Sequence, residues 1–484
     1  MEQQKQKADF APPPNRPQLL GTPLVHYGPL WDEGLEQAGE RAEGPVAVLV
    51  CHGMGQQVRY ETISSIAEAI LEEAGTAGGT VLPVEVHLSK ENGSFLARAE
   101  IHWIDKGKRE HNVHVYEAYW APLTEGRVTY WDTVKFLLLA AWNGLKFSLP
   151  FGPRSFERWI FGGRKTMRIG RATFFALLCV LSFLALQVGV IGFVLFELAQ
   201  QYKLVLSQAT PSLSIVDLLH PGSNLVHAWL RWLGPFFPGH EILLHSPAFV
   251  LEWWWAIVKL TAWFATIAEA LFARYFLIEY VGDVAAYISP YKDSKFEAIR
   301  QQIQKIGLDV GKLIYGFGGP FSAVPHYEKV VVVGHSLGSV LAYDTLNALI
   351  NQDNVSAPPD RRDVVRRTRA LVTFGSPLDK TAFIFRMQVN SDQGWIREQL
   401  VASAQPLIVN YPLYRPISFD WVNIWSRMDI ISGELNYYDD PSLPPNVAPC
   451  VQNKPDPEAR TPLLAHVQYW NNQLLRQQLY RFLS

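Results

Sequence analysis

The sequence predicts an α/β protein whose mostly parallel sheet, with helices on both faces, is interrupted by a helical transmembrane insertion. Three features lead to this prediction. Four consecutive valines, residues 330–333, run into a glycine-flanked turn; "PVAVLVCHGMGQQ", residues 45–57, is a second apolar run with a glycine-rich end; and residues 172–196 carry no charge in 25 positions. Continuous β-branched runs are typical of strands buried on both faces. A long uncharged run is typical of a membrane span.

Length and charge limit the possible classes of protein. The chain has 484 residues and a formal net charge of −2, which suggests two or three units and gives no overall field that would recruit nucleic acid. Hydrophobic residues make up 48% of the chain, with the excess concentrated mid-chain, which points to a membrane. Cys51, Cys179 and Cys450 are too scattered for a disulfide framework and have no metal-ligand spacing. We therefore expect a reducing compartment and no metal or cofactor.

The first elements along the chain are a lead-in and a buried strand. Residues 1–44 are a polar, proline-rich tail and lead-in without the apolar core of a cleavable signal peptide. Residues 45–150 are expected to form the first part of the α/β domain. In its first turn, Gly53 and Gly55 permit close backbone approach, and the amide of Met54 can donate to a developing oxyanion.

Alternating segments follow at residues 84–89, 98–104 and 111–123, and they predict strands of a half-exposed sheet. Four histidines lie at alternating or loop positions of this region, and we expect them to be surface polar residues rather than ligands: His87, His102, His111 and His114.

Residues 151–280 are predicted to form the membrane insertion. A helix is expected over about 172–198, and its 25 uncharged residues, 172–196, at about 1.5 Å each reach about 37 Å, more than the roughly 30 Å of a hydrocarbon core. A basic cluster precedes it, with Glu157 as the one acid in the same stretch: Arg154, Arg158, Arg164, Lys165, Arg168 and Arg171. By the positive-inside rule this side of the membrane is cytoplasmic.

A second hydrophobic helix, at about 248–280, contains charged residues that are costly at the bilayer centre. Glu252, Lys259 and Arg274 share one stripe, so the helix either spans with this stripe against protein or lies at the interface. The two halves of one sheet must be on the same side, so the insertion must cross an even number of times. Two spans satisfy this; a single span would need another crossing, such as 131–151.

The second part of the α/β domain, residues 281–484, contains the turn after the four valines. Gly334-His335-Ser336-Leu337-Gly338 matches G-x-S-x-G between a strand and a helix. Gly334 and Gly338 allow a tight reversal that would hold Ser336 strained and exposed as a nucleophile, with the amide of Leu337 directed at the reacting group. The alternative is that Ser336 only caps the helix.

Three further segments follow the same strand-then-turn order. "RALVTFGSPLDK", residues 369–380, is a strand with a turn, and "DWVNIWSRMDIISGEL", residues 420–435, has an apolar core that ends near Asp429. "TPLLAHVQYWNN", residues 461–472, places His466 just before an amphipathic C-terminal helix. All of these turns are expected at the carboxyl edge of the sheet, where ligands gather in such folds.

Together, "VLVCHGMGQQ", "VVVVGHSLGS", "LVTFGSPLD", "WVNIWSRMD" and "LLAHVQYWNN" resemble the α/β-hydrolase superfamily. Within it, the chain resembles lipase-like serine hydrolases of the membrane-associated, inositol-deacylase-like and uncharacterised bacterial branch, over residues 45–60 and 326–472. This resemblance implies Ser336 as nucleophile, Asp429 as acid and His466 as base, in the order typical of the superfamily. It also implies Met54 and Leu337 as backbone oxyanion donors. The chain departs from the pattern by its long insertion and by lacking an HGGG run.

Other residues compete for two of these roles. The acid could instead come from one of four other aspartates: Asp379, Asp420, Asp439 or Asp440. The base could instead be His326 or His335, although His335 lies within the turn itself and is too close in sequence to reach Ser336 correctly.

The expected function is a membrane-anchored serine hydrolase that cleaves carboxylic esters, in particular lipid esters, through an acyl-enzyme intermediate. Its partners would be the lipid bilayer and an acyl-ester or lipid substrate, with the hydrolase domain on the cytoplasmic side of an inner or plasma membrane. Two alternatives remain open: an acyltransferase that uses the same site, and a catalytically silent scaffold or binding protein with the same fold.

Overall fold

A computed structural model describes most of the α/β part of the chain. Apart from isolated positions, the described residues are 24–27, 44–55, 57–91, 94–124, 155–158, 165–168, 282–288, 294–317, 326–386, 418–438, 450–461 and 464–484. The chain divides into two compact units, of which the first comprises Met1–Arg127, Asn143–Ala176 and Asp283–Ser484. The second comprises Val128–Trp142 and Leu177–Gly282.

The predicted spans at 172–198 and 248–280 lie outside the described residues, except for isolated positions. No helix within the described ranges is both long enough and apolar enough to cross a bilayer.

The first unit is built on a mostly parallel sheet, so the predicted α/β class is confirmed. The described residues form a ten-stranded sheet in the order β1-β4-β5-β6-β2-β9-β10-β11-β12, with β3 paired to β5. Its strands are β1 (Leu24–Tyr27), β2 (Val46–Cys51), β3 (Thr80–Val81), β4 (Glu85–Glu91), β5 (Ser94–Ile104), β6 (Glu110–Ala118), β9 (Lys329–His335), β10 (Thr368–Phe374), β11 (Asp420–Trp425) and β12 (Val451–Pro455). A separate antiparallel pair joins β7 (Ser155–Arg158) to β8 (Lys165–Arg168).

The strands differ in direction between the two halves of the sheet. From β6 through β2, β9, β10 and β11 to β12, every neighbouring pair is parallel. The β4–β5 and β5–β6 pairs are antiparallel, which fits their short connections and alternating sequence. All parallel strands of the first group therefore end at the same edge, and the turns after β2, β9, β10, β11 and β12 share that edge.

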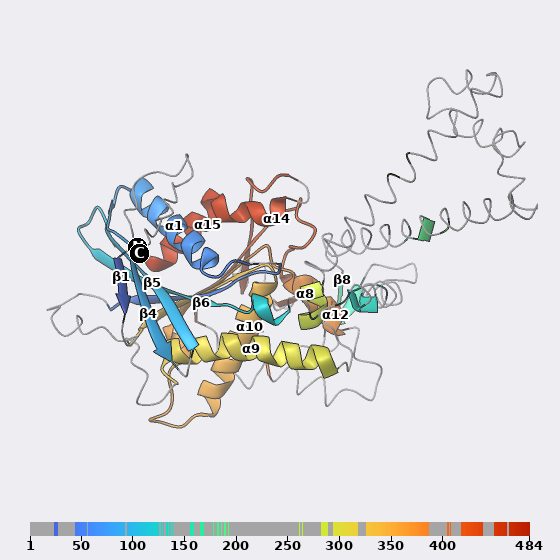
Figure 1. Ribbon diagram of the computed structural model, residues 1–484, viewed down its shortest axis with the longest axis horizontal. Coiled ribbons are helices and arrows are strands. Elements are labelled where there is room, and N and C mark those ends of the chain that lie inside the picture. The colour runs from blue at the N-terminus through green and yellow to red at the C-terminus, as the bar shows by residue number, and fades with distance from the viewer. Residues whose placement is uncertain are drawn as a thin grey trace, which may run out of the picture. The chain divides into compact units, whose positions relative to one another are not determined.

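Helices cover both faces of this sheet (Figure 1). α1 (Glu61–Thr76) and α15 (Gln473–Leu483) pack over one face, where their apolar side chains join those of the central strands in one core. α9 (Ser294–Tyr315) and α10 (Leu337–Val355) pack on each other and on the opposite face. Shorter elements complete the unit: η2 (Ala121–Leu123), α8 (Gly282–Ile288), α11 (Val364–Arg367), α12 (Leu378–Arg386), η5 (Asn436–Tyr438), α14 (Ala465–Gln468) and η6 (Tyr469–Asn471).

The central strands are buried because their sequence is apolar on both faces. Val330, Val331, Val332 and Val333 of β9 all have no exposed surface. β2 and, except at Arg369, β10 are buried as well, as expected for strands that lie between two helical layers. β1 is an exception to the sequence analysis: it falls within the expected lead-in, yet it pairs with β4 at the edge of the sheet.

Candidate active site

The turn that carries Ser336 is strained. β9 ends at His335 and α10 begins at Leu337, so Ser336 alone makes the reversal, with φ 52° and ψ −131°. Positive φ values cost non-glycine residues about 1–3 kcal/mol and persist only where the surroundings enforce them. Here the amide of Ser336 donates to the carbonyl of Phe374 at 3.0 Å, and the Ser339 hydroxyl donates to the carbonyl of Ser336 at 2.6 Å. The predicted strand-to-helix turn is therefore present, and it is fixed from two sides.

The two glycines of the turn are required by close backbone contacts. A Cβ atom on Gly338 would collide with the carbonyl oxygens of Cys51 and His52, which end β2. A Cβ on Gly334 would lie 2.5 Å from the Cα of Ser339. Since these neighbours are backbone atoms, no side-chain rotation could relieve the overlap. The glycines thus allow α10 to begin directly against the end of β2.

The glycine-rich turn after β2 lies against Ser336, because β2 and β9 are parallel neighbours and their following turns share one edge of the sheet. A Cβ on Gly53 would be 2.9 Å from the Cβ of Ser336. His52 braces this turn: its Nδ1–H donates to the carbonyl of Gly53 at 2.8 Å, and its Nε2 accepts from the amide of Trp120 at 2.9 Å. Burial lowers the pKa of His52 to about 4, so the ring is neutral at physiological pH and keeps this tautomer.

Leu337 and Met54, whose backbone amides are predicted to hold an oxyanion, both lie in the turns beside Ser336. Leu337 is the first residue of α10, where amides have no partner within the helix. Met54 follows Gly53 in the β2 turn, and its side chain is buried. Gly55, the next residue, has φ 93°, a value that favours glycine.

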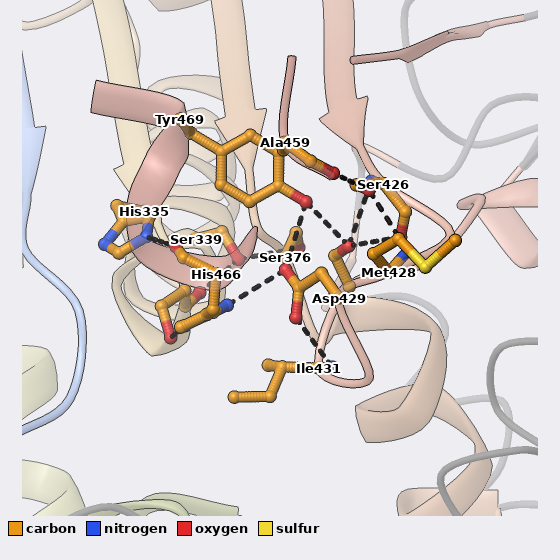
Figure 2. A network of polar contacts seen from close by, with 12 residues as sticks. His335, Ser339, Ser376, Ser426, Met428, Asp429, Ile431, Ala459, His466 and Tyr469 are labelled. Carbon is orange, nitrogen blue, oxygen red and sulfur yellow. Dashed lines mark hydrogen bonds and ion pairs between the residues drawn. The ribbon is translucent and has the colours of Figure 1, made fainter. Parts of the chain in front are cut away.

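Ser336, His466 and Asp429 form one hydrogen-bonded chain. Ser336 donates its hydroxyl proton to Nε2 of His466 at 2.7 Å, and Nδ1–H of His466 donates to Oδ2 of Asp429 at 3.0 Å. His466 lies on α14, beyond β12, and Asp429 lies in the loop after β11. The sequence separates the histidine from the serine by 130 positions. Figure 2 shows the side chains around Asp429 and His466 converging from these separate elements.

The carboxylate of Asp429 is buried but well supplied with donors. It is 2% exposed, and besides His466 it accepts from the Tyr469 hydroxyl at 3.0 Å on Oδ2 and from the Ile431 amide at 2.9 Å on Oδ1. Burial would raise the pKa of Asp429, but the neighbouring His466 and these hydrogen bonds outweigh it and lower the pKa to about 2. Asp429 is therefore ionised across the physiological range and can stabilise a cationic imidazolium.

Tyr469 is a member of this network that the sequence analysis did not identify. Its hydroxyl also contacts the Ser432 hydroxyl at 3.0 Å, and burial together with the Asp429 charge raises the pKa of Tyr469, so the phenol keeps its proton. Tyr469 begins η6, three residues after His466, so one helical turn brings both donors to the same oxygen of Asp429. The three-residue spacing between His466 and Tyr469 is the sequence feature that could have identified Tyr469.

His335, a competing base in the sequence analysis, supports His466 from the other side. Its Nε2–H donates to the backbone carbonyl of His466 at 3.0 Å, and its ring stacks on Phe374. Burial, followed by the effect of His466, lowers the pKa of His335 to about 3, so the ring is neutral. It is therefore placed to position the base, while its own ring nitrogen is bonded away from Ser336.

The other candidate acids lie elsewhere or outside the described residues. Asp379 pairs with Lys380 at 3.1 Å, and Asp420 lies 3.3 Å from Arg481. Asp439 and Asp440 are outside the described residues.

One expectation about Ser336 is wrong. It was expected to be exposed, but it has no exposed surface, because the imidazole of His466 and the backbone of Gly53 lie directly against it.

No family model, no curated protein and no solved structure matches this chain.

Proposed function

We propose that this chain is a membrane-anchored serine hydrolase of the α/β-hydrolase type that cleaves carboxylic esters through an acyl-enzyme intermediate. One observation carries the proposal: the unbroken hydrogen-bonded chain from Ser336 through His466 to Asp429, with Ser336 on a strained strand-to-helix turn. A serine that only caps a helix needs no imidazole at 2.7 Å, nor a buried ionised carboxylate behind that imidazole.

The residues divide the reaction in the usual way for such a triad. His466 Nε2 takes the hydroxyl proton as Ser336 Oγ attacks the ester carbonyl carbon, and Asp429 stabilises the resulting imidazolium. The amides of Leu337 and Met54 would hold the oxyanion. Collapse of the tetrahedral intermediate breaks the bond to the alcohol, which leaves with the proton from His466. Water then repeats the sequence on the acyl-serine, releasing the carboxylic acid and restoring the serine.

A lipid ester is the substrate class that we propose, because the expected membrane insertion would hold the site at a bilayer. The support comes from the uncharged run at 172–196 and from the basic cluster before it. Isolated described positions in the two hydrophobic stretches are helical with exposed apolar side chains: Leu178 is 47% exposed, Val188 71% and Phe264 74%. On this proposal the hydrolase domain lies on the cytoplasmic side.

One observation favours a second candidate, a silent scaffold with the same fold. Ser336 has no exposed surface and His466 is only 7% exposed, so a substrate must displace neighbouring groups to reach the hydroxyl. Acyl transfer to an alcohol in place of water would use the same residues as hydrolysis.

Covalent labelling separates enzyme from scaffold. The full chain in detergent is incubated with a fluorophosphonate probe, and the modified peptide is located by mass spectrometry. We expect one label per chain on Ser336, none in Ser336→Ala, and full labelling in Ser65→Ala, a matched change at a half-buried serine of α1. A folded wild-type chain that stays unlabelled would favour the second candidate, a catalytically silent scaffold, over the enzyme. Comparing detergent-solubilised esters of short and long acyl chains would then test the substrate class.

A further inference from the structure

A second cluster of chemically capable side chains lies away from the triad, on the β4–β5–β6 part of the sheet. Glu85, Glu100 and His102 each offer one oxygen or nitrogen atom, and these atoms lie within 4.8 Å of one another. His87 and His114 flank the same carboxylate: their Nε2 atoms are 3.4 Å and 3.6 Å from Oε1 of Glu100.

The register of the strands creates this cluster. Glu85 of β4 is directly opposite Glu100 of β5, and Glu100 is directly opposite His114 of β6. Directly opposed residues point to the same face, and so do residues two apart on one strand, which adds His87 and His102. Two carboxylates directly opposite each other repel, so this pairing needs positive charge nearby.

Arg98 supplies positive charge to Glu100. Its Nε donates to Oε1 of Glu100 at 2.6 Å, and the arginine has no exposed surface. The second oxygen of Glu100, Oε2, faces Nε2 of His102 at 3.9 Å. Arg98 therefore fixes the orientation of the carboxylate and leaves its other oxygen directed at an imidazole.

The donor set suits a transition-metal ion. Imidazole nitrogen together with carboxylate oxygen is a typical ligand set for zinc, whereas calcium and magnesium take oxygen ligands. Ligand atoms around a tetrahedral zinc ion lie about 3.4 Å apart, given bonds of about 2.0–2.2 Å. The three atoms here lie within 4.8 Å of one another, so side-chain rotation has to bring them closer together around an ion. We propose that Glu85, Glu100 and His102 form a binding site for a zinc-type divalent cation.

A buried polar network behind the cluster provides the support that metal ligands need. Nδ1 of His114 contacts the Tyr327 hydroxyl at 2.7 Å, which in turn contacts the Tyr116 hydroxyl at 2.6 Å. His114 is 1% exposed and Glu100 2%, while His102 is 21% exposed and His87 12%. The cluster is thus buried on its inner side, at His114 and Glu100, and partly exposed on its outer side, at His102 and His87.

This burial corrects the sequence analysis, which placed the four histidines at the surface. His114 is buried because the phenol of Tyr327 closes over it, and its partner in the β6–β5 pair is the buried Glu100. The expectation that the chain has no metal is replaced here by a testable site.

The site is structural rather than part of the ester chemistry. His114 is level with Ala47 in β2, which is level with Val330 in β9. Ser336 lies six residues beyond Val330, about 20 Å farther along the sheet at about 3.3 Å per residue. An ion here would link strand β4 to strand β5 and would not touch the substrate.

Zinc binding to the purified full chain tests the proposal. The chain, without a histidine tag, is stripped with chelator, exposed to Zn²⁺ and dialysed, and bound metal is counted by mass spectrometry. We expect one zinc ion per chain and a melting temperature several degrees higher with zinc. Glu85→Gln and His102→Gln should each weaken zinc binding by about tenfold or more.

His111→Gln is the matched control, because His111 also faces a carboxylate, that of Asp105 at 3.3 Å, in a different pair. It should bind zinc like the wild type. Should the ligand variants misfold, visible absorption of wild-type chain loaded with Co²⁺ still reports a site of low coordination number. Absence of stoichiometric zinc and of this absorption, or equal zinc binding by His102→Gln and His111→Gln, would overturn the proposal. Labelling of Ser336 is unaffected by either result, so the two proposals fail independently.

Discussion

Replacing Asp429 by asparagine tests the proposed division of roles, because the structure leaves an amide no good orientation. Oδ1 of Asp429 accepts from the Ile431 amide, and Oδ2 accepts from both His466 and Tyr469. If the amide oxygen of asparagine stays with Ile431, its NH₂ group faces Nδ1 of His466. That imidazole must then carry its proton on Nε2, which can no longer take a proton from Ser336. In the flipped orientation, NH₂ meets the Ile431 N–H instead.

The magnitude follows from which orientation is adopted. The wrong tautomer in a serine triad lowers kcat by about 10⁴-fold, which corresponds to about 5 kcal/mol at about 1.36 kcal/mol per factor of ten. The flipped orientation preserves the tautomer but leaves two donors facing each other in a buried place, at a cost of about 1–3 kcal/mol in folding stability. We expect the first outcome to dominate, with kcat reduced about 10⁴-fold.

The assay is ester hydrolysis by Asp429→Asn in detergent, measured beside the free energy of unfolding. Asp379→Asn is the matched control, since Asp379 is another buried aspartate near the same sheet edge, paired with Lys380 rather than with an imidazole. It should retain kcat within a few-fold. A folded Asp429→Asn chain that keeps more than about a tenth of wild-type kcat would refute the proposed role of the carboxylate.

Three further changes test the surroundings of the site. Tyr469→Phe removes one hydrogen bond to a carboxylate and should lower the unfolding free energy by about 1.5–3 kcal/mol at pH 7. The stabilisation from the lowered pKa of Asp429 is fully present above its ordinary pKa of 3.8 and is lost as pH falls from there to about 2, so the difference between variant and wild type should shrink within this window. Equal differences at pH 7 and pH 3 in chemical denaturation would argue against it. Gly338→Ala should lower the free energy of unfolding by at least about 1–3 kcal/mol and remove most of the activity, because the new Cβ collides with the backbone carbonyls of Cys51 and His52. The control is Gly75→Ala in α1, where a Cβ would have nothing within 4 Å, and it should be neutral or stabilising. Similar melting temperatures for the two variants would contradict the packing argument. Burial lowers the pKa of His335 to about 3, so unfolded chains bind more protons than folded ones between about pH 6.5 and pH 3. The free energy of unfolding should therefore decrease as the pH is lowered through that window, by up to about 1.36 kcal/mol per pH unit. His335→Gln should reduce that slope in chemical denaturation, and an unchanged slope would show that the ring titrates normally.

The central strands and the turn at Ser336 were predictable because their signals are local. Four β-branched residues in a row are sufficient to indicate a buried strand, and glycines on both sides of a serine indicate a tight reversal. Ser336 is indeed held at φ 52° between β9 and α10. The edge strand β1 was missed because only four residues pair there, in a proline-rich lead-in.

The parts that sequence reasoning missed depend on contacts between distant elements. The burial of Ser336 results from His466 of α14 and from Gly53 in the turn after β2, which are far from Ser336 in the sequence. The cluster at Glu100 depends on strand register, which a list of alternating residues does not specify. Tyr469 could have been proposed from its spacing to His466, but its bond to Asp429 requires the loop after β11 to lie beside η6.

The most direct test of the central claim is the acyl-enzyme itself. An excess of a p-nitrophenyl ester is mixed with the wild-type chain, the reaction is quenched within the first turnover, and acylated peptides are identified by mass spectrometry. The proposed mechanism predicts a burst of one nitrophenol per chain and a single acyl group on the peptide that contains Ser336, both absent in Ser336→Ala. Hydrolysis without a burst, or an acyl group on another residue, would contradict it.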